Sequence, residues 1–163
     1  MSDTMSREEA YRRLTARCST KECCVWEVRE KMRNWNIPRV EEESLVEQLL
    51  AEKYIDESRY CRAFVNDKFR FDGWGRIKIG YTLRQKMIDS LTVSQSLQSI
   101  DEEEYCECLM KLLKSKMRSL KALPPHAQCE KLMRFALSRG FEPHLISKSL
   151  KELSPQCEIG SEI

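Results

Sequence analysis

Internal repetition is the feature that most limits how this chain can fold. Residues 55–61, Ile-Asp-Glu-Ser-Arg-Tyr-Cys, recur 45 positions later as Ile-Asp-Glu-Glu-Glu-Tyr-Cys, with five of the seven positions identical. A weaker first copy begins at Ser6, which takes the place of Asp56 and Asp101. Each of these short polar residues comes just before acidic residues. This pattern is typical of a helix N-terminus, because the side chain accepts a backbone N–H that has no partner within the helix.

A second apolar pattern also occurs three times, in residues 28–37, 79–88 and 132–141. Each stretch begins and ends with apolar residues nine positions apart, and a polar or Pro-containing turn follows it. A third segment then carries apolar residues spaced by three and four, such as Val93 and Leu97 in the middle copy. These spacings are typical of amphipathic helices. The chain is therefore interpreted as three copies of a three-helix unit.

The copies predict an all-α fold of three tandem three-helix repeats in an elongated, curved, right-handed array. We expect repeat one at residues 5–53, repeat two at 54–100 and repeat three at 101–153, followed by a flexible tail at 154–163. A unit of about 50 residues buries little surface alone, so stacked neighbours should supply the missing core. One long face should remain open to a partner.

The composition agrees with a helical protein outside the membrane. Gly and Pro number only five each among 163 residues, whereas a sheet-rich fold needs these residues for its turns. No apolar run approaches the roughly 18 residues of a membrane span. The first residues are polar and of mixed charge, which does not match an export signal. We therefore expect a cytoplasmic protein that has no contact with a membrane and is a monomer.

Eight cysteines raise the question of disulfides or bound metal. Thiols stay reduced in the expected compartment, so structural disulfides are not expected. The adjacent pair Cys23 and Cys24 and the close pair Cys106 and Cys108 do not match the spacing of zinc knuckles. We interpret the cysteines as small apolar residues of helix cores, and we expect no metal and no cofactor.

The sequence contains no group of residues that indicates an enzyme. His126 and His144 are far apart and fall in an expected turn and near an expected helix start. The acidic residues cluster at helix starts, where the helix dipole accounts for them. Neither glycine pattern that cradles phosphates, GxxxxGK[ST] or GxGxxG, is present. We expect no catalytic residue.

The net charge of +2 conceals strongly opposed blocks along the chain. Residues 41–57 sum to −6 and residues 59–87 sum to +6. Five acids without a base follow in residues 101–107, and five bases without an acid in residues 111–121. Such segregated charge can steer or orient a partner. Helix dipoles, which favour acids first and bases last, are the alternative explanation.

The basic block of repeat two runs through residues 69–78, Phe-Arg-Phe-Asp-Gly-Trp-Gly-Arg-Ile-Lys. Alternating aromatic and basic residues suit single-stranded nucleic acid or a protein-binding hot spot. A glycine turn after a helix, with rings packed inward, is the structural alternative. We expect some rings to pack while three bases point outward, namely Arg70, Arg76 and Lys78.

Three segments of the middle copy form a recognisable pattern. They are residues 54–65 (Tyr-Ile-Asp-Glu-Ser-Arg-Tyr-Cys-Arg-Ala-Phe-Val), 73–79 (Gly-Trp-Gly-Arg-Ile-Lys-Ile) and 83–88 (Leu-Arg-Gln-Lys-Met-Ile). This pattern resembles the RecX family of bacterial recombination regulators, over about residues 10–153. The family's usual Pro after the second glycine is absent, and Met87 stands where Gly is common.

The resemblance implies a crescent-shaped protein that lies in the groove of the RecA filament and contacts several RecA subunits. It implies modulation, usually inhibition, of strand exchange, ATP hydrolysis and co-protease activity in DNA repair and the SOS response. Auxiliary contact with single- or double-stranded DNA is also considered. The alternative is a helical DNA-binding module that acts without a recombinase.

The partner surface that the resemblance suggests is the basic face of repeat two, with a second basic face in repeat three. The expected residues of the first face are Lys68, Arg70, Arg76, Lys78, Arg84 and Lys86. The expected residues of the second face are Lys111, Lys114, Lys116 and Arg118.

Overall fold

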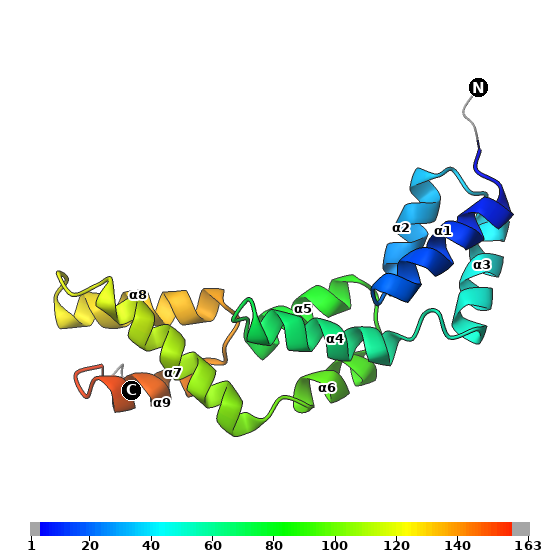
Figure 1. Ribbon diagram of the computed structural model, residues 1–163. Helices are drawn as coiled ribbons and strands as arrows, with labels where there is room; N and C mark the ends of the chain where they lie inside the picture. Colours follow the sequence, from blue (N-terminus) through cyan, green and yellow to red (C-terminus); the bar gives the residue numbers. More distant parts are fainter. Residues whose placement is uncertain (1–3, 158–163) are drawn as a thin grey trace. The chain divides into compact units, whose positions relative to one another are not determined.

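The computed structural model describes residues 4–157 and is built from helices alone over that range (Figure 1). The described helices are α1 (Arg7–Thr20), α2 (Val25–Asn34), α3 (Arg39–Ala51), α4 (Glu57–Arg70), α5 (Arg76–Gln85), α6 (Ser90–Gln98), α7 (Glu102–Arg118), α8 (Pro125–Ser138) and α9 (Pro143–Leu153). The predicted all-α fold is confirmed. Within the described range, no helix is both long enough and apolar enough to pass through a bilayer.

The repeated Ser or Asp residues cap helices as expected. Ser6, Asp56 and Asp101 each accept a hydrogen bond from the backbone N–H three positions later, at 3.2, 3.0 and 2.9 Å. These bonds satisfy N–H groups that the first helical turn leaves unpaired. The recurring motif therefore marks the start of the first helix in each copy.

The second helix of each copy ends on a residue in the left-handed conformation. Asn36, Met87 and Gly140 have φ values of 56°, 60° and 92°. The buried apolar residues that follow them are Ile37, Ile88 and Phe141. Left-handed residues end helices because their N–H groups turn back to the last free carbonyls. The Gly140 N–H, for example, donates to the Leu137 carbonyl at 3.0 Å.

The chain divides into two compact units. Unit 1 holds the residues up to 64 together with 83–96, and unit 2 holds 65–82 and the residues from 97 onward. The boundaries fall within α4, α5 and α6, so the middle copy contributes to both units. The repeat boundaries at 5–53, 54–100 and 101–153 stay a prediction.

Each unit has its own apolar core. In unit 1 the core lies among α1, α2 and α3, and its buried residues include Ala10, Leu14, Val28, Met32, Leu45 and Leu49. In unit 2, α7, α8 and α9 pack against one another. Tyr105 is fully buried there, with ring-centroid distances of 5.7 Å to Phe69 and 5.1 Å to Phe141. The third copy thus packs against part of the second.

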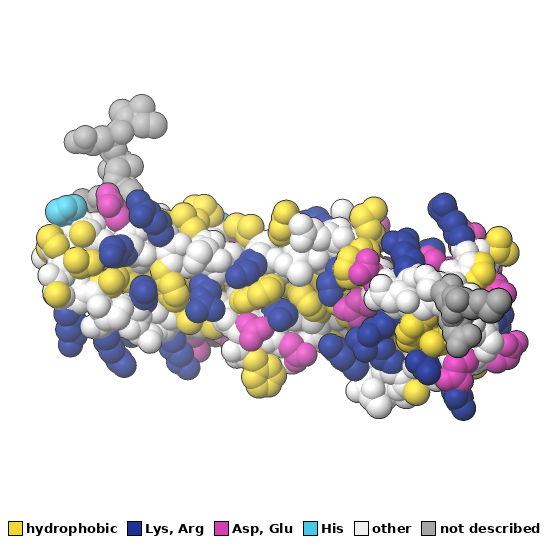
Figure 2. All heavy atoms as spheres, turned by 90° about the horizontal axis from the view of Figure 1, so that it is seen from above, with side chains coloured by type: hydrophobic (Ala, Val, Ile, Leu, Met, Phe, Trp, Pro, Cys, Tyr) yellow, Lys and Arg dark blue, Asp and Glu magenta, His cyan; other side chains and the backbone are white. Residues whose placement is uncertain are grey.

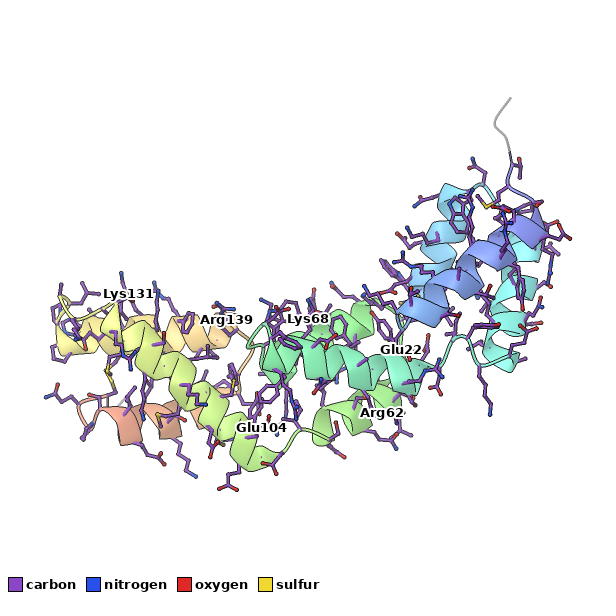
Figure 3. The ribbon with its side chains drawn as sticks, in the orientation of Figure 1. Glu22, Arg62, Lys68, Glu104, Lys131 and Arg139 are labelled. Atoms are coloured by element: carbon purple, nitrogen blue, oxygen red, sulfur yellow. A yellow bond between two sulfur atoms is a disulfide. The ribbon has the colours of Figure 1, made fainter. Side chains whose placement is uncertain are left out.

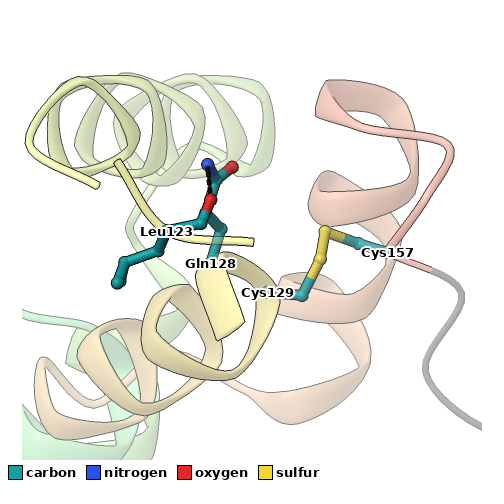
Figure 4. The surroundings of a disulfide bond; sticks show 4 residues. All are labelled: Leu123, Gln128, Cys129 and Cys157. Carbon is teal, nitrogen blue, oxygen red and sulfur yellow. Dashed lines mark hydrogen bonds between the residues drawn. A yellow bond between two sulfur atoms is a disulfide. The ribbon is translucent and has the colours of Figure 1, made fainter. Parts of the chain in front are cut away.

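The expectation that structural disulfides are absent is wrong. Cys129 in α8 and Cys157 are bonded and buried, close to the hydrogen bond between Gln128 Nε2 and the Leu123 carbonyl (Figure 4). The bond ties residues 154–157 to α8, so the expected flexible tail does not begin at residue 154. Residues 158–163 of that tail lie outside the described residues.

The remaining cysteines are free thiols. Those of unit 1 are buried, as the interpretation as core residues requires: Cys18, Cys23, Cys24 and Cys61. Cys106 and Cys108 in α7 are only half-buried. Between residues 4 and 157, no group of three or more His, Cys, Asp or Glu side chains is placed to hold a metal ion.

Candidate interaction surface

The Gly-Trp-Gly-Arg segment forms a close joint with the turn between α8 and α9 in unit 2. The Gly75 N–H donates to the Arg139 carbonyl at 2.7 Å, and the Ile77 N–H donates to the Gly140 carbonyl at 2.9 Å. A Cβ on Gly75 would lie 2.4 Å from the carbonyl carbon of Gly140, too close for any side chain. Glycine is required at both positions because the two backbones touch. The glycines of this motif therefore join the middle copy to the third.

Arg76 lies inside this joint, so the expectation that it points outward is wrong. Its guanidinium pairs with Glu142 at 3.0 Å and with Glu102, and it lies 3.9 Å from the Tyr105 ring centroid. Only 20% of the side chain is exposed. Burial alone would lower the pKa of Arg76, but the bonds to both carboxylates outweigh it and raise that pKa. Glu102 and Glu142 therefore hold the Arg76 guanidinium in place.

Tyr105 completes the network around Arg76. Its hydroxyl accepts the Arg76 backbone N–H at 3.0 Å and donates to the Glu142 carboxylate. Burial first, and then the bond to Glu142, raise the pKa of Tyr105 far above its ordinary value. Because both of its polar contacts are within unit 2, this tyrosine stabilises the joint.

Lys86 lies in a similar network within unit 1. Its ammonium donates to Glu27 at 2.9 Å and to the Tyr60 hydroxyl at 2.8 Å, while Tyr60 itself donates to Glu27 at 2.7 Å. Burial raises the pKa of Glu27, but the bonds from Lys86 and Tyr60 prevail and leave that pKa below its ordinary value. Lys86, also 20% exposed, is a structural cation.

The other cations of the middle copy are more accessible. Arg70 is 58% exposed and lies 3.5 Å from Glu104, and Arg84 is exposed on α5. Lys68 and Lys78 both lie against the Trp74 ring, with ammonium groups 4.7 and 4.4 Å from its centroid. Because two ammonium groups already lie against the indole, this ring is better suited to holding cations than to stacking on a nucleotide base.

A similar arrangement of cations and an aromatic ring lies on α8. Arg139 donates from its side chain to the Asp72 carbonyl at 3.2 Å, and its guanidinium lies 5.3 Å from the Phe135 ring. Lys116, one of the expected residues of repeat three, lies 5.4 Å from the same ring. We name the two groups together the cation–aromatic strip, formed by Lys68, Trp74, Lys78, Lys116, Phe135 and Arg139.

The strip lies on a surface of unit 2 that is rich in basic side chains. In Figure 3, Lys68, Arg139 and Lys131 are all on the upper side of unit 2. Figure 2 shows this side, with Lys and Arg side chains interspersed with apolar ones over α8. Three further expected residues, Lys111, Lys114 and Arg118, are exposed on α7. No local signal marks Phe135 and Arg139 in the sequence, because contacts with the distant residues Asp72 and Gly75 bring this part of α8 to the middle copy.

Family models identify this chain by its second and third copies. The model for the second three-helix domain of RecX matches residues 56–97, and the model for the third matches residues 102–150. Together these matches span more than half of the chain. The chain belongs to the RecX family. The matches also confirm that it is a helical repeat protein.

Curated relatives from several bacteria are named regulatory protein RecX. The one from Clostridium botulinum strain Eklund 17B is 30% identical over 131 residues, which are 77% of this chain and 59% of the relative. This chain thus matches about three fifths of the length of that protein. The one from Prosthecochloris aestuarii is 29% identical over 153 residues, with 94% and 98% covered.

Two solved structures of RecX proteins share the fold. The crystal structure of RecX from Lactobacillus salivarius has a TM-score of 0.81 at 18% identity, covering 91% of this chain and 97% of that one. A second regulatory protein RecX has a TM-score of 0.81 at 21% identity, covering 90% and 71%. These two structures therefore support the fold.

Proposed function

We propose that this chain binds in the groove of the RecA recombinase filament and inhibits its strand exchange, ATP hydrolysis and co-protease activity. It acts in DNA repair and the SOS response, in the cytoplasm where the filament forms. The match of two RecX three-helix domains carries the proposal. Tandem units add support, because several modest contacts along a filament combine into strong overall binding. The chain itself catalyses no step.

The partner surface in this proposal is the cation–aromatic strip of unit 2. Lys68, Lys78 and Lys116 remain from the expected residues, and Arg139 joins them. Arg70 and Arg84 of the middle copy and Lys111, Lys114 and Arg118 of α7 remain accessible candidates. Arg76 and Lys86 leave the set because carboxylates within the chain bind them and only 20% of each side chain is exposed, whereas Lys68, which also pairs with Asp72 at 3.0 Å, is 31% exposed.

The test measures RecA-mediated strand exchange and ATP hydrolysis on single-stranded DNA with the chain added below the RecA concentration. We expect both rates to fall at substoichiometric ratios, because one bound protein blocks more than one RecA subunit. Unchanged rates across the titration contradict the proposal.

A DNA-binding module that needs no recombinase is the second candidate function, favoured by the cations of unit 2. Such a module binds naked DNA tightly, and its affinity falls steeply with salt because phosphate pairing releases counterions. Tight, salt-dependent binding to naked DNA together with unchanged RecA activity would favour this candidate over the filament regulator.

A further inference from the structure

A groove between α7 and α9 in unit 2 has a chemistry opposite to that of the cation–aromatic strip. Its lining residues are Glu103, Cys106, Glu107 and Met110 on α7, and Leu145, Lys148, Ser149 and Glu152 on α9. On each helix they follow the spacing i, i+3, i+4, i+7, so each wall is one continuous helix face. The groove has a volume of about 320 Å³.

The groove combines acidic and apolar groups. Glu103, Glu107 and Glu152 are exposed, while Met110 and Leu145 are half-buried beside them. Among the ion pairs of residues 4–157, none involves any of these three carboxylates. Lys148 on α9 is the one basic residue of this lining, so three carboxylates stand against one ammonium group. The excess of negative charge favours a cation, and the apolar side chains can pack on its aliphatic stem.

Ser149 adds a buried polar group to the groove wall. It is only 7% exposed and lines the groove. Among residues 4–157, the buried side-chain oxygens that lack a partner are Glu22 Oε2 and Glu27 Oε2, so the Ser149 hydroxyl is not an unpaired buried group. A donor that enters the groove can hydrogen-bond this hydroxyl in place of water.

The corresponding place in the first copy is occupied by an arginine of the chain itself. Arg7 on α1 reaches across to α3 and donates to Ser44 Oγ at 3.1 Å and to Gln48 Oε1 at 2.9 Å. Ser44 and Gln48 lie seven and eleven residues after Ile37, as Lys148 and Glu152 lie after Phe141. The first copy thus shows how a guanidinium bridges the first and third helices of a unit.

The third copy has no arginine of its own for this place. The residue after the helix cap is Arg7 in the first copy and Glu102 in the third, and Glu102 pairs with Arg76 instead. In the third copy Lys148 stands at the position of Ser44, and no arginine of α7 bridges the groove.

We propose that the α7–α9 groove binds an arginine side chain that a partner protein presents beside an apolar residue. The guanidinium pairs with the carboxylates of Glu103 and Glu107, because planar guanidinium and carboxylate groups form paired charged hydrogen bonds. Its aliphatic stem packs on Met110 and Leu145. The three carboxylates repel nucleic acid, so this surface selects protein. The inference stands independently of the recombinase proposal.

The test is a titration of the full chain with the peptide acetyl-Ala-Leu-Arg-Ala-Leu-Arg-amide, followed by amide chemical shifts. A copy with citrulline in place of arginine keeps the shape and removes the charge. We expect saturable shifts at the groove residues, with binding of the citrulline copy about tenfold weaker. Equal binding of the two peptides, or no saturable shift at millimolar peptide, overturns the proposal.

Matched variants locate the binding. Glu103→Gln with Glu107→Gln keeps side-chain size and should weaken peptide binding about tenfold. Glu47→Gln with Glu130→Gln removes two exposed carboxylates elsewhere and should leave binding unchanged. Circular dichroism establishes that both variants are folded. Equal weakening by the two variants would mean that the peptide binds acidic surface in general, which contradicts the proposal. A titration with a single-stranded oligonucleotide should leave the amide shifts of the groove residues unchanged. Shifts of these residues would contradict a site that selects protein.

Discussion

Two tyrosines at the same position of the repeated motif organise the charges of their units. Tyr60 and Tyr105 each lie four residues after a capping Asp, and each donates a hydrogen bond to a glutamate. A cation completes both groups, Lys86 in one and Arg76 in the other. Removing one partner of such a half-buried group leaves the remaining charge unpaired. The motif therefore recurs for a reason beyond helix capping.

The variant Arg76→Met tests the structural role of this cation. It leaves Glu142, whose side chain is 18% exposed, without its guanidinium. We expect the free energy of unfolding to fall by about 2 kcal/mol, measured by urea denaturation. The control Arg84→Met changes an exposed arginine of the same helix and should stay within about 0.5 kcal/mol. Equal stability of the two variants contradicts the assignment.

The network around Glu27 predicts a pH dependence of stability. Because its folded-state pKa lies below the ordinary 4.5, the carboxylate contributes stability that is fully present above pH 4.5. That stability is lost as the pH falls through the lower, folded-state pKa. The difference in unfolding free energy between the wild type and Glu27→Gln should therefore shrink in acid. A difference that stays constant from pH 7 down to pH 3 would contradict this coupling.

The second helices of the three copies end in the same backbone conformation, although a different residue adopts it in each copy. Asn36, Met87 and Gly140 all have positive φ values. Asn tolerates this left-handed conformation, whereas it costs free energy in Met. Gly140 has no freedom to change, because a Cβ there would lie 2.3 Å from that of Lys78. Met87 is 82% exposed, so its side chain packs little against the rest of the fold.

The variant Met87→Gly should be more stable than the wild type. Glycine removes the steric cost of positive φ, and the exposed methionine gives up little packing. We expect the unfolding free energy to rise by about 1 kcal/mol in urea denaturation. The matched change Gly140→Ala should lower it, because it adds both strain and a clash. A destabilised Met87→Gly protein contradicts the account of this helix end.

The disulfide fixes the end of α9 to α8. Its reduction should lower the unfolding free energy by about 3 kcal/mol, because the bond closes a loop over 28 positions. Melting with and without dithiothreitol measures the change, and Cys157→Ser should lose this sensitivity. Removing residues 154–163 should cost as much as reduction, since Cys157 goes with them. Identical melting in both conditions would show that the bond contributes nothing.

The sequence could predict those features that depend on local signals. Helix caps at Ser6 and Asp101 and helix ends near Ile37 and Phe141 follow from spacing alone. The burial of Arg76 could not be predicted, because the carboxylate of Glu142 comes from 66 positions away. The same holds for the bond between two cysteines 28 positions apart. Contacts between copies decide whether a basic residue serves the fold or a partner.

Across the whole molecule, unit 2 carries two surfaces of opposite charge. In the two proposals, the cation–aromatic strip binds the RecA filament and the α7–α9 groove binds an arginine of a partner protein. The balance of +2 for the chain arises from separate fields of opposite charge.

The central claim is that the strip of unit 2 carries RecA inhibition. Its most direct measurement is RecA ATP hydrolysis on single-stranded DNA with the variant Lys68→Glu, Lys78→Glu. The control Arg12→Glu, Arg39→Glu reverses two charges in unit 1 whose side chains are 76% and 90% exposed. We expect the strip variant to need at least about tenfold more protein for half-inhibition, because each reversal also adds repulsion. We expect the control to inhibit as the wild type does. A folded strip variant that inhibits as well as the control contradicts the claim.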